Sequence, residues 1–468
     1  MPRPRPTAGL SSALRGDRIR AAALEVLADV LEEGQLADRA LSRVLRRERK
    51  LLSGERRAVA ETIYGLLRRE AALRQALIRA LGQRSIESFP ASAIHATLLF
   101  GYQQLEGETP DVSSVSGLPA DLRRALGSLR AELEAQLVQA GSVGSAARLA
   151  LEHSLPGWLA EQLVTEVGAL ETERLFMALN RRAPLTLRTN LLRTTREALL
   201  DRLAALDVAS HPTPLSPWGV QLEQNPNVFG LEPFREGWFE VQDEGSQLLA
   251  LLCRARPGQL VVDACAGGGG KTLALAAEMH NRGELWALDV NARRLAELKP
   301  RARRAGAHNI RSLVVAEGEA DPAAFEKLIG GADVVLVDAP CSGIGALRRN
   351  PDARRRLTSE SIAEHAARQL EILKRMAPLV RAGGLLVYAT CSVLRAEDES
   401  VAAAFLVTDE AFTPVPPSDL LGMELVAAID APLAGESVEG LRSPTALRLW
   451  PQHHGTDGFF AMALRRNK

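Results

Sequence analysis

The stretch LVVDACAGGGGKT, residues 260–272, decides the fold of the C-terminal half of this sequence. Its apolar start, rich in valine, predicts a short buried strand that ends at Asp263. Four consecutive glycines follow, and an apolar helical pattern continues to about His280. A strand, a glycine-rich turn and a helix in this order bring the free N–H groups of the helix N-terminus to the end of the strand. The stretch therefore predicts the first unit of an α/β sheet that carries a ligand-binding turn.

Beyond this unit, short apolar runs alternate with longer helical patterns. The apolar runs are 285–288, 310–315, 334–337 and 385–388, and the clearest helical patterns are 293–304 and 359–380. Strands of four to six residues separated by helices predict a parallel sheet covered on both faces. Two last strand candidates, 446–450 and 458–464, predict an antiparallel edge.

The four-glycine turn fits neither of two common phosphate-binding patterns. A P-loop requires glycine where this chain has Cys265, and the dinucleotide pattern requires glycine where it has Thr272. Asp289 ends the second predicted strand, where a carboxylate can accept hydrogen bonds from ribose hydroxyls. We therefore expect an adenosyl-type ligand, with S-adenosylmethionine favoured over a turn that is only structural.

Two cysteines follow the fourth and fifth predicted strands. Cys341 lies in the stretch DAPCSG at 338–343, and Cys391 lies in the stretch TCS at 390–392. Because the carboxyl ends of neighbouring parallel strands share one edge of a sheet, we expect the two thiols to converge. A lone cysteine is usually a small buried apolar residue, and we interpret Cys253 in that way. Two cysteines in polar turns, one of them close to an acid, indicate chemistry instead.

Methylation of cytosine at carbon 5 is a reaction that needs such a pair. A thiolate that adds to carbon 6 converts the unreactive ring into an enamine, whose carbon 5 can accept a methyl group. A carboxyl group near ring nitrogen 3 can hold the base and stabilise charge in the adduct. Lys271 lies at the same rim as the cysteines and can supply a neighbouring positive charge to the thiolate.

Composition excludes several classes of protein. The chain has 468 residues, and its 57 basic and 57 acidic side chains give a formal net charge of zero. This length predicts about two to four domains. Hydrophobic residues make up 46% and charged residues 24%, which indicates a folded core and not disorder. Neutrality excludes a protein coated in positive charge, although basic residues can still gather in one region.

Neither a membrane span nor a secretion signal is expected. No apolar run approaches the ~20 residues that cross a bilayer, and residues 1–10 lack the apolar core of a signal peptide. The four cysteines contain no C-x-x-C pair, which argues against a zinc site and a disulfide framework. We therefore expect a cytoplasmic protein without a metal ion.

Residues 1–145 are predicted to be helical, because apolar residues recur at helical spacing without a run of β-branched residues. Residues 1–90 contain 18 basic and 11 acidic side chains, and seven of the basic ones lie between Arg43 and Arg57. This basic run is either a solvated helix face or a surface that contacts phosphates.

The pattern changes after residue 145. A strand-like run at 183–190 and an amphipathic helical pattern at 196–206 predict a small α/β region that extends from 146 to 240. The α/β sheet then occupies residues 241–468, so we expect three domains.

At these motifs the chain resembles the Sun/RsmB-type RNA (cytosine-C5) methyltransferases. The matching stretches are DACA and GGKT within 263–272, DAPCSGIG at 338–345, RRNPD at 348–352, ATCS at 389–392, GWFEVQD at 237–243 and LRTN at 187–190. The resemblance implies an all-α, NusB-like RNA-binding domain, a small α/β linker domain and a C-terminal Rossmann-like class I methyltransferase domain. It also implies S-adenosylmethionine as cofactor and RNA as partner.

The resemblance implies a role for each matched residue. Cys391 would be the nucleophile, Cys341 would assist release of the methylated product, and Asp338 and Lys271 would face the target cytosine. Asp289 and Glu317 would contact the ribose and adenine side of the cofactor. The full cofactor-binding set implied is Cys265, Ala266, Gly267, Gly268, Gly269, Gly270, Lys271, Asp289, Arg294, Glu317, Asp338 and Pro340.

Three positions depart from the pattern of that family. The family usually has Ala-Pro where this chain has Gly267-Gly268, which costs preorganisation of the turn but removes no hydrogen-bonding group. Glu317 stands at a usual Asp position, and Asp398 stands where Asn is usual after the nucleophile.

The helical N-terminal region favours small-subunit (16S) ribosomal RNA over transfer RNA as the substrate of a monomeric enzyme. A non-catalytic RNA-binding or assembly factor is the alternative from another class, and it would require failed binding of S-adenosylmethionine. A DNA cytosine methyltransferase is a third reading, but that chemistry usually places its nucleophile in a Pro-Cys turn and would leave Cys391 without a role.

Overall fold

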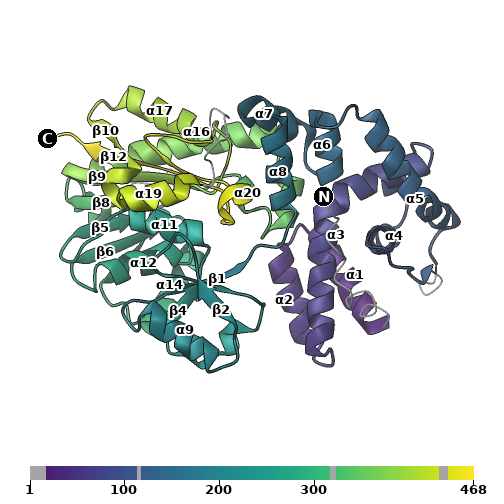
Figure 1. The fold of residues 1–468 in the computed structure, drawn as a ribbon, viewed down its shortest axis with the longest axis horizontal. Helices are drawn as coiled ribbons and strands as arrows, with labels where there is room; N and C mark the ends of the chain where they lie inside the picture. The colour runs from purple at the N-terminus through teal and green to yellow at the C-terminus, as the bar shows by residue number, and fades with distance from the viewer. Residues whose placement is uncertain (1–16, 113–116, 317–322, 432–440) are drawn as a thin grey trace. The chain divides into compact units, whose positions relative to one another are not determined.

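The computed structural model describes residues 17–112, 117–316, 323–431 and 441–468 (Figure 1). The chain divides into two compact units. The first contains the residues up to Asn180 together with Leu347–Leu357, and the second contains Arg181–Ala346 and Thr358–Lys468. Glu317 and the N-terminal ten residues, which were considered in the sequence, lie outside the described ranges. The predicted domain boundaries near residues 145 and 240 stay predictions.

The first unit is helical, as the sequence predicts for the N-terminal region. Its helices are α1 (Asp17–Leu31), α2 (Ala37–Arg47), α3 (Ser53–Ala80), α4 (Ala91–Leu105), α5 (Ala120–Gln139), α6 (Ala146–His153), α7 (Gly157–Val167) and α8 (Ala169–Leu179), with short 3-10 turns η1 (Ile86–Ser88) and η5 (Pro351–Arg356). Helix α3 is the longest, and the Glu55 carboxylate accepts a hydrogen bond from the Leu52 N–H at its start. Leu66 and Leu73 on α3 are fully buried in a core that α1, α2, α4 and α5 share. Burial of this apolar stripe stabilises the helical unit.

Residues 347–357 are distant in sequence from the rest of the first unit but pack within it. Arg354 helps to hold them there, because its guanidinium is buried and donates to four uncharged oxygens. These acceptors are the carbonyl oxygens of Arg68, His153 and Leu179 and the Asn180 side chain. Burial, followed by the nearby charges of Arg68 and Arg69, lowers the pKa of Arg354 to about 9.

The second unit contains two sheets, of which the smaller has the order β2-β3-β1-β4 and is antiparallel. Its strands are β1 (Leu185–Thr189), β2 (Ser210–Pro212), β3 (Gly219–Leu222) and β4 (Phe239–Val241). Helices α9 (Arg196–Ala204) and α10 (Glu232–Arg235), with the turn η3 (Val228–Gly230), accompany it. Leu187, Leu199 and Phe239 are buried in their shared core. The predicted strand at 183–190 and helix at 196–206 are thus confirmed.

The larger sheet has the order β10-β12-β9-β8-β5-β6-β7, and β11 pairs with β12. Its strands are β5 (Leu260–Asp263), β6 (Glu284–Asp289), β7 (Ile310–Val314), β8 (Ala332–Asp338), β9 (Val380–Thr390), β10 (Phe412–Val415), β11 (Leu447–Leu449) and β12 (Phe459–Arg466). Strands β5 to β9 pair in parallel, whereas β10, β11 and β12 pair antiparallel. The predicted parallel sheet with an antiparallel edge is therefore confirmed.

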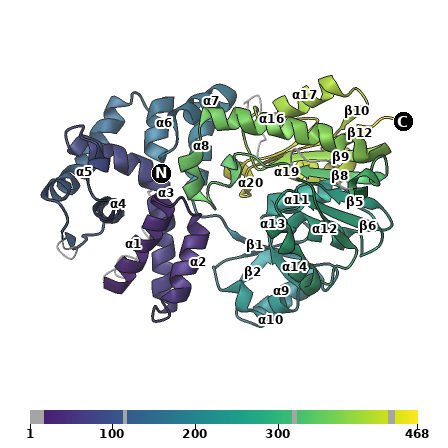
Figure 2. The same cartoon turned by 180° about the vertical axis from the view of Figure 1, so that it is seen from behind.

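Alternate residues of each strand face opposite sides of this sheet, as the period of two requires. Val261 and Leu336 belong to one core with α11 and α12, and Val262 and Val337 belong to the other core with α16 and α17 (Figures 1 and 2). The helices and turns of this region are α11 (Glu244–Leu252), α12 (Gly270–Glu278), α13 (Ala292–Ala296), α14 (Leu298–Ala305), α15 (Ala323–Glu326), η4 (Ile344–Ala346), α16 (Ser359–Met376), η6 (Ala377–Leu379), α17 (Glu399–Thr408), α18 (Pro417–Leu421), α19 (Met423–Asp430) and α20 (Pro451–His454).

Three elements differ from the sequence-based expectation. The helix expected at 293–304 is two helices, α13 and α14. Strand β9 begins at Val380, five residues before the expected start, because Val380 already pairs with Ala332 of β8. Strand β10 was not expected, since Pro414 interrupts its short apolar pattern. Within the described ranges, no helix combines the length and the apolar character needed to cross a bilayer.

Candidate active site

The four-glycine turn connects β5 to α12 and is held by Asp289 at the end of β6. The Asp289 carboxylate accepts hydrogen bonds from the Gly267 N–H and from the Asn291 N–H, both at 2.7 Å. Gly269 has φ +85° and would place a Cβ 2.2 Å from Leu298 Cδ1, so only glycine fits there without a shift. Nothing lies within 4 Å of the corresponding position at Gly267. The turn is thus tightly packed on one side and open on the other.

Arg301 joins this turn to the smaller sheet of the same unit. Its guanidinium donates to the Gly268 carbonyl oxygen at 2.5 Å and to the Glu240 carboxylate of β4 at 3.0 Å. Glu240 also pairs with Arg304. Arg188 of β1 reaches the start of α12, where it donates to the Gly270 carbonyl oxygen at 2.6 Å. These contacts fix the four-glycine turn.

Lys271 and Asp338 lie together, although 67 residues separate them in the sequence. Lys271 is in the first turn of α12 and Asp338 ends β8, and the Lys271 Nζ donates to the Asp338 carboxylate at 2.6 Å. Burial opposes the charge of Lys271, but the attraction and hydrogen bond of Asp338 outweigh it, so the pKa of Lys271 is raised. Lys271 therefore keeps its positive charge at this strand edge.

The two cysteine turns converge at the same edge of the sheet. The Cys341 Sγ lies 3.3 Å from the Cys391 Sγ, which confirms the expected convergence. The strands that precede them, β8 and β9, are neighbours, and the Ala339 N–H donates to the Ala389 carbonyl oxygen at 2.8 Å. The hydrogen bond to Cys391, burial and the charge of Cys391 raise the pKa of Cys341 well above its ordinary value. The Cys341 thiol therefore keeps its proton at neutral pH.

The remaining candidate residues occupy the rim around these groups. Cys265 and Ala266 are half-buried in the turn after β5, and burial raises the pKa of Cys265. The Ala266 N–H donates to the Leu288 carbonyl oxygen at 2.8 Å. Arg294 is exposed on α13. The Pro340 carbonyl oxygen accepts a hydrogen bond from Gln369 at 3.0 Å.

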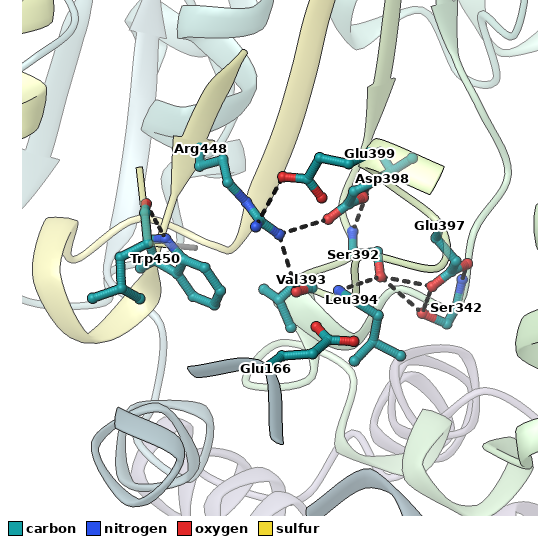
Figure 3. Close-up of polar contacts among 12 residues, drawn as sticks. Glu166, Ser342, Ser392, Val393, Leu394, Glu397, Asp398, Glu399, Arg448 and Trp450 are labelled. Atoms are coloured by element: carbon teal, nitrogen blue, oxygen red, sulfur yellow. Dashed lines mark hydrogen bonds and ion pairs between the residues drawn. The ribbon is translucent and has the colours of Figure 1, made fainter. Parts of the chain in front are cut away.

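No role was assigned from the sequence to two groups of residues at this edge. Asp263, at the end of β5, is 1% exposed and accepts a hydrogen bond from the Thr272 hydroxyl at 2.7 Å. Its burial raises the pKa of its carboxyl group to about 6. The second group is Glu397 with Ser342 and Ser392, the residues that follow the two cysteines and donate hydrogen bonds to it (Figure 3). The only sequence signal for Glu397 was the acidic run at 397–399 shortly after the TCS stretch.

Comparisons with known proteins agree with this arrangement. The family model described as 16S rRNA methyltransferase RsmB/F matches residues 250–465, and the model described as the RsmF/B-like ferredoxin-like domain matches residues 155–229. The probable ribosomal RNA small subunit methyltransferase B of Synechocystis sp. is 31% identical over 464 residues, covering 96% of this chain and 99% of the relative. Ribosomal RNA small subunit methyltransferase B of Pseudomonas syringae is 32% identical, with 70% of each chain covered.

Among solved structures, the crystal structure of PH0851 superposes with a TM-score of 0.74 at 26% sequence identity. The match covers 96% of this chain and 98% of that one. The match to the Synechocystis relative and the match to this structure each extend over nearly the whole chain. The chain belongs to the RsmB/F family of S-adenosylmethionine-dependent 16S rRNA methyltransferases.

Proposed function

We propose that this protein methylates carbon 5 of a cytosine in small-subunit ribosomal RNA through a covalent adduct with Cys391. The observation that carries the proposal is the 3.3 Å separation between the Cys341 and Cys391 sulfurs, beside the Lys271–Asp338 pair. Two thiols, a cation and a carboxylate at the ends of adjacent strands are the groups that this reaction requires.

The proposed methylation takes place in successive steps on the cytosine ring. The Cys391 thiolate adds to carbon 6 and forms an S–C6 bond, while Asp338 and Lys271 hold the polar edge of the ring and its developing charge. S-adenosylmethionine supplies the methyl group that carbon 5 receives. A base then removes the proton from carbon 5, the electron pair returns to the C5–C6 bond, and the S–C6 bond breaks. We assign to Cys341, whose Sγ lies 3.3 Å from the Cys391 Sγ, assistance in the departure of the sulfur.

The glycine turn fits the cofactor. The open side at Gly267 lets a ligand approach the backbone closely, and the N-terminus of α12 begins at Gly270. Asp289 lies beside the turn, at the strand end where an acid can accept hydrogen bonds from ribose hydroxyls. We assign the cofactor to these residues, with Asp289 on its ribose.

The helical first unit supports RNA as the partner, although fewer basic residues are available than the sequence suggests. Among the basic residues from Arg43 to Arg57, Arg43 and Arg47 pair with Glu25, and Arg57 pairs with Glu61. Arg56 donates to backbone carbonyl oxygens near the end of α2. Arg46, Arg49 and Lys50 are exposed. We infer a NusB-like RNA-binding role for this unit, with exposed ion pairs that can exchange carboxylates for phosphates.

The test is transfer of a labelled methyl group from S-adenosylmethionine to small-subunit ribosomal RNA. We expect 5-methylcytosine as the product, its loss in Cys391→Ala, and a gel-shifted protein–RNA adduct in Cys341→Ala. Calorimetry should show that both variants still bind S-adenosylmethionine. Methylation by Cys391→Ala would refute the nucleophile assignment. Transfer RNA or DNA as the better acceptor would refute the substrate, and failed cofactor binding by the unaltered protein would favour a non-catalytic assembly factor.

A further inference from the structure

Two consecutive buried carboxylates accept hydrogen bonds from the cysteine turns. Glu397 and Asp398 precede α17, and both side chains are 0% exposed (Figure 3). A buried carboxylate is costly unless hydrogen-bond donors satisfy it. The donors to this pair include Ser342, Thr390 and Ser392, from the two turns that carry Cys341 and Cys391.

Glu397 connects the residue after one cysteine to the residue after the other. Its Oε1 accepts a hydrogen bond from the Ser342 N–H at 2.8 Å, and its Oε2 accepts one from the Ser342 hydroxyl. The same Oε2 accepts a hydrogen bond from the Ser392 hydroxyl at 2.6 Å. One carboxylate therefore holds both turns.

The residues that precede the cysteines are also held. Gln369 donates to the Pro340 carbonyl oxygen at 3.0 Å and to Glu397 Oε1 at 3.2 Å. Asp398 accepts a hydrogen bond from the Thr390 hydroxyl at 2.6 Å, and its other oxygen pairs with Arg448 at 3.2 Å. Each cysteine is thus flanked on both sides by residues bonded to one network.

We propose that Glu397 is a positioning residue that sets the distance between the Cys391 nucleophile and Cys341. The proposal rests on the proposed function of these cysteines. Glu397 does not touch the reacting atoms, and it acts through Ser342 and Ser392. A displacement of about 1 Å can cost on the order of 100-fold in rate. The hydrogen bonds from Ser342 and Ser392 to Glu397 therefore matter for the rate, because they hold the turns of both cysteines.

The charge of Glu397 also affects the pKa of Cys341. The negative carboxylate is one of the causes that raise the pKa of Cys341, after the hydrogen bond to Cys391, burial and the charge of Cys391. Glu397 therefore helps to keep the proton on Cys341.

The first measurement is the methyl-transfer rate of position 397 variants. We expect Glu397→Ala to lower kcat by at least about tenfold, with KM for RNA and Kd for S-adenosylmethionine changed by less than about twofold. Glu397→Gln keeps an acceptor for Ser342 and should recover most of the rate. Glu399→Gln is the matched control, because Glu399 pairs with Arg448 and not with the cysteine turns.

The second measurement reports on the sulfur–sulfur distance without any methyl transfer. Diamide removes two electrons and two protons from the two thiols, closes a Cys341–Cys391 disulfide and is itself reduced to a hydrazine. We expect rapid closure in the unaltered protein and in Glu399→Gln, and closure at least about fivefold slower in Glu397→Ala, where the turns are no longer joined. Peptide mapping distinguishes this disulfide from products of Cys253 and Cys265.

The pH dependence of thiol alkylation tests the positioning role of Glu397 separately from any effect of the substitution on folding. In Glu397→Gln the thiol of Cys341 should react at lower pH than in the unaltered protein, since a neighbouring negative charge is gone. Should Glu397→Ala not fold, Ser392→Ala removes the contact on the Cys391 side alone and should slow closure. Unchanged closure and unchanged kcat in the folded variants would overturn the proposal. A protein that closes the disulfide as expected but forms no 5-methylcytosine would instead refute the proposed function.

Discussion

Asp263 carries a carboxyl group in an environment that opposes its charge. It is buried at the end of β5, beside the glycine turn, and a single hydroxyl, that of Thr272, donates to it at 2.7 Å. Burial raises its pKa from 3.8 to about 6. The folded protein therefore holds a proton on Asp263 in a pH range where the unfolded chain has already released it.

The first prediction concerns this proton. As pH rises from about 4 to about 6, the unaltered protein should lose up to roughly 3 kcal/mol of folding free energy through Asp263, because the folded state binds the proton more tightly. Asp263→Asn should lack this loss. Urea unfolding at about pH 4 and about pH 7 measures it, and a stability difference between the two proteins that is the same at both pH values would contradict the prediction.

The sequence predicts the main groups of the site because each follows a recognisable strand. Cys341, Cys391 and Asp338 stand directly after apolar runs, and strand ends in a parallel sheet meet at one edge. Glu397 could not be found in that way, since it lies in a loop before α17 and its role depends on donors from two distant turns. The sequence shows that an acid is present there but not that it is buried.

At the scale of elements, the turn between β5 and α12 depends on glycine at one position more than at another. Gly267 and Gly269 both have positive φ values, of 53° and 85°. Only at Gly269 would a Cβ meet a neighbour, the buried side chain of Leu298 on α14. Replacing Gly267 by alanine therefore costs folding free energy only through the backbone conformation. At Gly269 the same replacement costs folding free energy through both the conformation and the contact with Leu298.

The second prediction compares these two glycines. Gly267→Ala should cost about 1 kcal/mol of folding free energy, the usual cost of a left-handed conformation for alanine. Gly269→Ala should cost roughly 2–4 kcal/mol, because an overpacked contact with Leu298 is added. Thermal unfolding of the two variants provides the measurement, and equal losses would show that Leu298 moves aside freely.

Element boundaries were predictable only where the local pattern decides them. The strands of the parallel sheet carry uninterrupted apolar runs, so their existence follows from the sequence. The break between α13 and α14 occurs at Glu297, three residues before Pro300, which has no N–H to continue the helix. The early start of β9 comes from pairing with β8, which a local pattern does not contain.

At the scale of the whole molecule, the chain builds its two units from interleaved segments. The segment 347–357 belongs to the helical unit, although the residues on both sides of it belong to the other. In the sequence this segment is arginine-rich and contains the RRNPD motif, but its place in the helical unit follows from tertiary contacts such as the burial of Arg354 among backbone oxygens. Tertiary packing of this kind cannot be predicted from spacing or composition.

The third prediction tests how firmly this segment is held. Arg354→Met should remove the guanidinium that donates to the carbonyl oxygens of Arg68 and Leu179 and destabilise the segment by about 3 kcal/mol. Amide hydrogen exchange within 347–357 should then be faster by about 100-fold. Arg356→Met is the control, because Arg356 is half exposed and, among the described residues, pairs with Asp352 of the same segment. Equal exchange in the two variants would contradict the assignment.

The interleaved segment also sets an order of events during synthesis on the ribosome. The helical unit emerges as far as Asn180, but Arg354 becomes available only after residues 181–346 have been translated. At about 5–20 residues per second, this delay lasts roughly 10–30 seconds. Throughout that interval the nascent helices lack the guanidinium that later satisfies their carbonyl oxygens. The N-terminal helical unit therefore acquires its last structural piece from a part of the message that is decoded much later.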